Sequence, residues 1–103
     1  MAYNELRYTA WYMIKNIKCK RTQALYEGKN PKQFRAFKAQ TERKLQMLDA
    51  AVELLDLLSP LGNKFEKLGG HSLGQYSIRI NKQWHICFAW TNEPCAVDIT
   101  NYH

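Results

Sequence analysis

The sequence predicts an α+β fold in one domain, with N-terminal helices packed on one face of a small antiparallel sheet. Apolar residues recur with a helical period in the first half of the chain and alternate with a period of two in the second half, so helices come first and strands last. The length of 103 residues suits one hydrophobic core, because two half-sized cores would bury too little apolar surface to offset the entropy of ordering the chain.

The first residues are set apart from this domain. Residues 1–12 precede a second methionine, Met13, which could be the biological start. We therefore treat 1–12 as an N-terminal extension that need not be native, and 13–103 as the single domain. A short strand-like stretch opens the domain at 13–17.

Two helices are predicted next. Thr22 is placed to cap a short helix that runs to about Tyr26, after which Gly28 and Asn30-Pro31 break the chain. A long amphipathic helix then extends to about Ser59-Pro60. Its apolar stripe, with spacings of three and four, consists of Phe34, Phe37, Thr41, Leu45, Leu48, Val52 and Leu55.

The C-terminal half of the long helix is expected to be the more deeply buried half. Additional apolar residues widen the stripe there, namely Met47, Leu54 and Leu58. The same half carries three acids, Asp49, Glu53 and Asp56, at the helix end where the macrodipole disfavours negative charge. We therefore do not expect these acids to serve helix stability.

A three-stranded antiparallel meander is predicted for the last part of the chain. A three-residue loop at 81–83 keeps apolar residues on one face, whereas a two-residue turn would mix the faces. After a turn at 91–94, a last strand continues the same apolar face. The expected pairs are Ile80 with Trp84, Ile78 with Ile86, Tyr76 with Phe88, Val97 with Phe88, and Ile99 with Ile86.

The opposite face of this meander carries polar side chains that are distant in sequence. The register places Arg79 beside His85 and His85 beside Thr100, with Tyr102 within reach. A cation, an imidazole and a phenol on one surface suit a polyanion whose bases stack on the aromatic ring. The alternative is the solvated side of an ordinary sheet.

The net charge of +6 is unevenly distributed. Residues 15–44 carry ten cations against two acids, a net charge of +8, whereas residues 45–63 carry three acids and no cation, a net charge of −3. A basic region of this density suits phosphate backbones, because neutralising phosphates releases counterions. A solvated helix surface is the alternative.

Composition also narrows the compartment and the chemistry. No run approaches the roughly 20 apolar residues of a membrane span, and the N-terminus lacks signal-peptide character, so we expect a cytoplasmic protein without membrane contact. The three cysteines, Cys19, Cys87 and Cys95, lack CxxC spacing and are expected to be buried reduced thiols. The three histidines are poorly spaced for zinc, and we expect no metal or other cofactor.

From about Glu42 to the end, roughly 60% of its length, the chain resembles HigB-type toxins of the RelE-like superfamily. Residues 43–51 match the family's helix pattern RKL..LDAA, and Leu68, Gly70 and Gly74 followed by 76–81 match its glycine-punctuated hairpin start. Gln83-Trp84, Phe88 and the final 101–103 match its NWR..F and DYH patterns.

The resemblance implies a RelE-like fold and a ribosome-dependent endoribonuclease that cuts mRNA in the decoding site without a metal. It also implies silencing by a helix-turn-helix antitoxin of the HigA type, with operator DNA contacted only through the antitoxin complex. The family's terminal Tyr and His fall on Tyr102 and His103, but its terminal Asp falls on Asn101 and its Arg after the hairpin Trp falls on His85. A histidine of some members falls on Glu66, and the family's basic loop residue falls near Ser72, beside His71.

These matches lead to two sets of expected site residues. The catalytic candidates are His103, Tyr102, Asn101, Glu66, His85 and Arg79. The RNA-binding candidates are Lys64, Lys67, His71, Lys82, Lys38 and Arg43. Within them we expect a base and an acid from His103 or Glu66, charge stabilisation from Arg79 with Lys64 or Lys67, and base stacking on Tyr102.

The departures at Asn101 and His85 leave a second function open. An arginine is a permanent, bidentate phosphate ligand, whereas a histidine is charged only when protonated. The rival hypothesis is a toxin-fold protein that binds the ribosome or its antitoxin without cutting RNA. A DNA-binding module fits poorly, because the sequence has no evident recognition helix.

Overall fold

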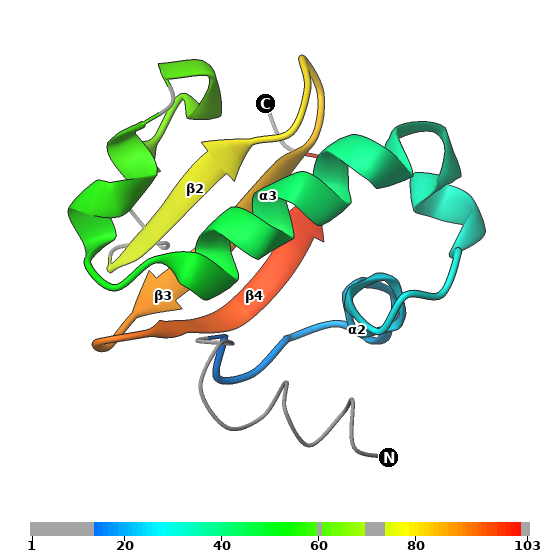
Figure 1. Ribbon diagram of the computed structural model, residues 1–103, viewed down its shortest axis with the longest axis horizontal. Helices are drawn as coiled ribbons and strands as arrows, with labels where there is room; N and C mark the ends of the chain where they lie inside the picture. The colour runs from blue at the N-terminus through cyan, green and yellow to red at the C-terminus, as the bar shows by residue number, and fades with distance from the viewer. Residues whose placement is uncertain (1–13, 60, 70–73, 102–103) are drawn as a thin grey trace.

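The computed structural model describes residues 14–59, 61–69 and 74–101, and it places helices before an antiparallel sheet (Figure 1). The α-helices are α2 (Lys20–Tyr26) and α3 (Lys38–Ala50), and the 3-10 helices are η2 (Lys32–Phe37), η3 (Leu54–Leu58) and η4 (Leu61–Asn63). The strands are β1 (Glu66–Lys67), β2 (Gln75–Arg79), β3 (His85–Trp90) and β4 (Pro94–Thr100), and they form one sheet in that order. The predicted α+β class is confirmed, while the extension 1–12 and Met13 lie outside the described residues.

The register of the sheet agrees with the prediction. Tyr76 pairs with Phe88 and Ile78 with Ile86 across β2 and β3, and Ile80 donates its amide to the Trp84 carbonyl at 2.9 Å, which closes the three-residue loop. Ile86 pairs with Ile99, as expected. One irregularity follows, because two residues of β4, Ala96 and Val97, oppose the single residue Phe88. Ala96 takes up the extra length with a φ of 50°.

Helix α3 covers the apolar face of the sheet, as Figure 1 shows. Leu45 and Leu48 of the helix are buried against strand residues such as Phe88 in one core cluster. Each such side chain contributes about 1.5–3 kcal/mol through apolar burial. The predicted stripe is confirmed from Phe34 to Leu48, since all five of its residues there are buried.

Aromatic rings join η2 to the hairpin. Trp84 stacks on Phe37 with 5.2 Å between ring centroids and meets Phe34 edge-on at 5.7 Å. Trp84 and Trp90 are half-buried and pack against the core, rather than lying fully inside it.

The prediction that the long helix continues to about Ser59-Pro60 is wrong. Helix α3 ends at Ala50, and the backbone turns extended at Ala51. Asp56 causes the break, because its carboxylate accepts the amides of Val52 and Glu53 at 2.9 and 3.0 Å and so begins η3 with a capping box. Val52, Leu55 and Leu58 are consequently exposed, not deeply buried.

All three acids have structural roles that we did not expect. Glu53 and Asp56 form the capping box of η3, so both serve helix stability. Asp49 is buried, and its Oδ1 accepts the Ile14 amide at 3.1 Å and the Tyr26 hydroxyl at 3.0 Å. It thereby joins the N-terminal segment, α2 and α3.

The predicted cap at Thr22 is also wrong. Cys19 is the N-cap of α2, and Thr22 lies buried within the helix. Its hydroxyl accepts the Ile99 amide at 3.1 Å and donates to Asp98 Oδ1 at 3.2 Å. The Thr22 hydroxyl therefore makes its hydrogen bonds at the edge of β4 and does not cap the start of its own helix.

The N-terminal segment runs along the same edge of β4. Ile17 forms a parallel bridge with Val97, and Lys18 donates its amide to the Val97 carbonyl at 2.9 Å. The predicted strand-like stretch is thus a single bridge in the described residues, and with α2 it covers the outer edge of the sheet. None of the helices in the described part of the chain has the length and apolar character needed to cross a bilayer.

Candidate functional site

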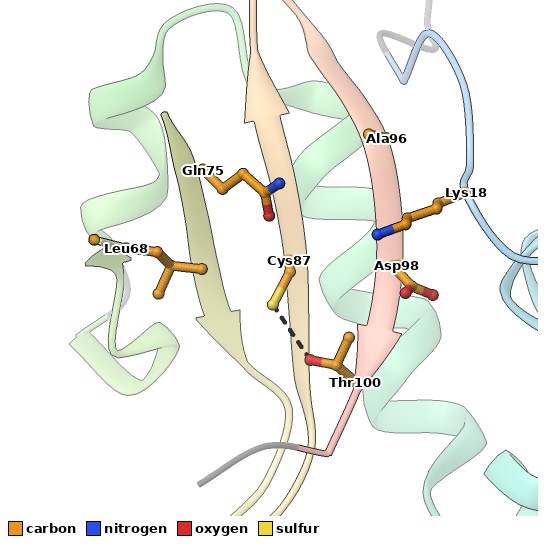
Figure 2. Close-up of a pocket in the computed structure, with 8 residues that line it drawn as sticks. Lys18, Leu68, Gln75, Cys87, Ala96, Asp98 and Thr100 are labelled. Atoms are coloured by element: carbon orange, nitrogen blue, oxygen red, sulfur yellow. Dashed lines mark hydrogen bonds between the residues drawn. The ribbon is translucent and has the colours of Figure 1, made fainter. Parts of the chain in front are cut away.

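The face of the sheet opposite α3 is lined with polar side chains, and we call it the polar face. Strand pairing places Arg79, His85 and Thr100 in one row across β2, β3 and β4. The neighbouring row holds Ser77, Cys87 and Asp98, and Gln75 follows on β2. In Figure 2, which looks onto this face, α3 lies behind the sheet and the labelled side chains lie in front.

A pocket of about 630 Å³ lies on the polar face. Figure 2 shows the Lys18 side chain lying across β4 beside Asp98, with Leu68 on the β1 side of the pocket. The lining is part polar and part apolar, which suits an organic group that has both a flat apolar surface and hydrogen-bonding edges. The residues that line it are Lys18, Leu68, Gly69, Gln75, Cys87, Ala96, Asp98 and Thr100.

The row of Arg79, His85 and Thr100 lies at the hairpin end of the polar face. Arg79 is half-buried, and its Nε donates to the Asn81 carbonyl at 3.0 Å. That bond ties the guanidinium to the hairpin turn and restricts its orientation. Thr100 belongs both to this row and to the pocket lining, so the two features are continuous.

Cys87 is the centre of the neighbouring row. Its Sγ lies 3.3 Å from Thr100 Oγ1. Burial raises the pKa of the Cys87 thiol above its ordinary value. The thiol is therefore protonated at neutral pH and acts as a hydrogen-bonding wall of the pocket, not as a nucleophile. We expected buried thiols, but all three cysteines are only half-buried.

The structure brings together some of the predicted site residues. Glu66 lies on β1 opposite Ser77, which makes it a diagonal neighbour of Arg79 on the polar face. Lys82 is exposed in the hairpin loop, next to the Arg79 end of the face. Asn101 is exposed and directly follows Thr100.

Other predicted residues lie elsewhere. Lys67 pairs with Tyr76, whose ring packs toward the core, so Lys67 sits at a register position of the opposite face. Lys64 is exposed beyond η4, with a φ of 46°. Lys38 and Arg43 belong to α3, in the layer on the other side of the sheet.

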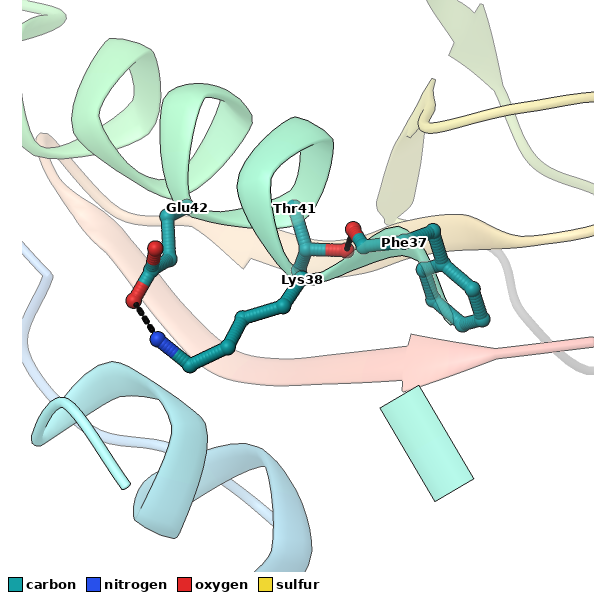
Figure 3. A network of polar contacts seen from close by, with 4 residues as sticks. All are labelled: Phe37, Lys38, Thr41 and Glu42. Carbon is teal, nitrogen blue, oxygen red and sulfur yellow. Dashed lines mark hydrogen bonds and ion pairs between the residues drawn. The ribbon is translucent and has the colours of Figure 1, made fainter. Parts of the chain in front are cut away.

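Lys38 is further occupied by a contact within its own helix. Figure 3 shows its side chain beside that of Glu42, with Nζ 2.7 Å from Oε2. Nearby, the buried Thr41 hydroxyl donates to the Phe37 carbonyl at 2.9 Å. This part of α3 is therefore occupied by internal contacts, and the polar face does not include it. His71, Tyr102 and His103 lie outside the described residues, as does Ser72.

Sequence reasoning missed the contribution of Lys18 and Asp98. The register could have placed Asp98 beside Cys87, because both follow from strand alternation. No local sequence pattern predicts the position of Lys18, because it depends on the bridge between Ile17 and Val97. Across 14–59, 61–69 and 74–101, no three His, Cys, Asp or Glu side chains gather closely enough to hold a metal ion.

A helix laid over one face of a four-stranded antiparallel sheet, with polar rows on the other face, defines the class of the protein. The YoeB-YefM complex from Staphylococcus aureus contains a chain that matches with a TM-score of 0.57 and 22% identity, covering 87% of this chain and 94% of that one. The likeness shows the RelE-like fold.

The family follows from the sequence. Residues 15–103 match the family described as the RelE-like toxin of the type II toxin-antitoxin system HigB, and the chain belongs to this family. Toxin HigB-1 of Vibrio cholerae serotype O1 is 50% identical over 50 residues, which are 48% of this chain and 53% of the relative. An uncharacterized protein of Haemophilus influenzae is 42% identical over 50 residues, which are 48% of this chain and 50% of the relative. The chain spans about half the length of the curated relatives it matches.

Proposed function

We propose that this chain is a toxin that cuts mRNA on the ribosome, in the decoding site and without a metal, and that a helix-turn-helix antitoxin silences it. One observation carries the proposal. Arg79, His85 and Thr100 stand in a row on the polar face, and the chain continues from that row into Asn101, Tyr102 and His103.

The chemistry requires three functions. The ribose 2′-hydroxyl attacks the adjacent phosphate, so a base must take its proton and an acid must protonate the leaving 5′-oxygen. Positive charge must also stabilise the phosphorane-like transition state. Arg79 supplies the permanent charge, held in place by its bond to the Asn81 carbonyl.

The remaining functions fall to residues around this row. His103 or Glu66 serves as the base or the acid, and the diagonal position of Glu66 beside Arg79 supports this role. His85 adds charge when it is protonated. Tyr102 stacks on or positions a base.

The pocket supports a single-stranded substrate. Bases of unpaired RNA can leave the stack and enter a protein pocket, where their edges are hydrogen-bonded. The pocket adjoins the row of Arg79, His85 and Thr100, because Thr100 belongs to both. Its charged groups are Lys18 and Asp98. We assign it to a nucleobase next to the scissile phosphate.

The rival function is a toxin-fold protein that binds the ribosome or its antitoxin without cleavage. It is favoured by His85, because a histidine in the row replaces the permanent charge that an arginine would supply. The two functions make the same complexes and differ only in whether RNA is cut.

Controlled expression in a bacterial host tests the proposal. Induction of the chain should arrest growth, and His103→Ala should abolish the arrest without changing the thermal melting temperature. Arg79→Ala should reduce RNA cleavage on purified ribosomes by about 100- to 1000-fold, because it removes a charge from the transition state.

Lys29→Ala is the matched control, since Lys29 is exposed in the turn after α2 and away from the polar face. It should arrest growth like the unchanged chain. Arrest that persists in both His103→Ala and Arg79→Ala, or no arrest by the unchanged chain, would contradict the proposal.

A further inference from the structure

Four exposed hydrophobic side chains belong to the segment that follows α3, on or next to the contacting helices η3 and η4, and we call them the apolar patch. Val52 is 71% exposed, Leu55 68%, Leu58 49% and Leu61 88%. Every other large hydrophobic side chain that the structure describes is buried or half-buried. Exposed apolar surface of this kind on a small protein marks a place where another molecule binds.

The apolar patch stands on a segment that is already fixed in place. Leu57 is buried in the core, and Leu54 packs against it. The buried Asn63 side chain donates to the Leu57 carbonyl at 3.2 Å and accepts the Lys44 ammonium, which joins η3, η4 and α3. Because residues three apart eclipse in a 3-10 helix, Leu55 and Leu58 point to the same side of η3.

This anchoring matters for binding. A partner that docks on an ordered segment does not have to bear the entropy of ordering it, so more of the contact energy appears as affinity. Two leucines held on one side of η3 also resemble the central apolar area of a protein interface, which polar residues surround.

The charge of the segment argues against RNA as the occupant. Residues 45–63 contain no cation, and Glu53 and Asp56 are exposed beside the patch in a chain of net charge +6. Amide hydrogen bonds from Glu53 and Val52 lower the pKa of the Asp56 carboxyl, so its charge persists at neutral pH. A polyanion would therefore meet negative charge beside Val52 and Leu55, whereas Lys44 and Lys64 lie at the η4 end of the segment.

A second copy of the chain is also a poor occupant. In a twofold contact each patch meets its own copy, which would set Glu53 and Asp56 against the same acids. A partner with apolar side chains flanked by Lys or Arg would satisfy both the patch and its acids. An amphipathic segment with anchors three or four residues apart has this chemistry.

We propose that the apolar patch is the docking surface of the antitoxin, which inserts the apolar side of an amphipathic segment and sets basic side chains against Glu53 and Asp56. The proposal rests on the antitoxin partnership of the proposed function. Figure 1 shows η3 and η4 beside β2, at the side of the sheet away from β4 and α2. The docking surface is therefore distinct from the row of Arg79, His85 and Thr100.

The test uses the purified helix-turn-helix antitoxin of the proposed function, with its affinity for the full chain measured by calorimetry. The double variant Leu55→Ser/Leu58→Ser should weaken binding about tenfold or more, because central apolar anchors dominate interfaces. Glu53→Gln, which leaves the core untouched, should weaken binding in low salt more than in high salt. Gln40→Ala, exposed on α3, is the control and should bind like the unchanged chain.

The outcomes separate this inference from the proposed function. Unchanged affinity of both the double variant and Glu53→Gln would overturn the docking surface while leaving the partnership standing. No binding by the unchanged chain would overturn the partnership, and the docking surface with it. A chain that is dimeric alone, and monomeric as the double variant, would assign the patch to a second copy and overturn the proposal.

The double variant needs a check on folding. In a host without the antitoxin it should still arrest growth, since the patch is separate from the polar face. If the double variant has a lower melting temperature than the unchanged chain, the binding result of Glu53→Gln is used instead, because its effect on binding does not depend on the core.

Discussion

The hydroxyl of Thr22 joins helix α2 to the outer edge of strand β4. It accepts the amide of Ile99 and donates to Asp98, which is itself part of the pocket lining. The threonine therefore links the stability of the fold to the placement of a site residue. Its residue type suggested a cap, because Thr is favoured at helix starts, but a buried strand edge needs an acceptor more than an exposed helix end does.

Thr22→Val tests this role. The substitution keeps the shape of the side chain but leaves the Ile99 amide without its hydroxyl acceptor. We expect the free energy of unfolding in urea to fall by about 1–3 kcal/mol. Thr91→Val, at an exposed position, is the control and should change little. Equal stability of the two variants would mean that the bond to β4 contributes nothing.

At the scale of elements, the periodic pattern predicted helix α3 well up to Leu48 and failed beyond it. Val52 and Leu55 continue the spacing of the stripe, yet the backbone leaves the helix at Ala51. The carboxylate of Asp56 competes for the amides of Val52 and Glu53 and starts a new helix there. Periodicity records which residues are apolar, but it does not record this local competition.

Removing the Asp56 carboxylate should therefore loosen η3. In Asp56→Ala the amides of Val52 and Glu53 lose their acceptor, and their hydrogen exchange should become faster at neutral pH. The pKa of Asp56 is lowered in the folded chain, so the cap is fully present above the ordinary carboxyl pKa and is lost only as the pH falls through the lowered value.

Protection of these two amides in the unchanged chain should accordingly persist through mildly acidic pH and disappear in strong acid. Asp56→Asn is the matched control, because it keeps an acceptor oxygen without a titrating charge and should show protection that does not vary with pH. Equal protection of the amides in Asp56→Ala and the unchanged chain at neutral pH would contradict the role of the cap.

At the scale of the whole molecule, the sheet separates two surfaces. The polar face carries the row of Arg79, His85 and Thr100 with the adjoining pocket, whereas the apolar patch lies on the segment that follows α3. Glu53 and Asp56 make the apolar patch less favourable for a polyanion than the basic surfaces of the chain. Under the two proposals, substrate and antitoxin are recognised by different chemistry on two separate surfaces.

The row on the polar face could be predicted from sequence because it depends on a hairpin and a short turn, whose registers follow from alternation. The pocket could not, because Lys18 reaches it through pairing between the two ends of the chain. Lys38 illustrates the other limit. Its charge suggested RNA binding, and the structure places it in α3, beside Glu42 and in the layer on the other side of the sheet from the polar face.

We propose above all that the polar face cuts RNA. Mapping of transcript 5′ ends after brief induction tests it most directly, with Arg79→Ala and Lys29→Ala expressed in parallel. We expect new 5′ ends inside translated codons for the unchanged chain and for Lys29→Ala, and few or none for Arg79→Ala. Growth arrest without new ends, or the same ends in Arg79→Ala, would contradict the claim.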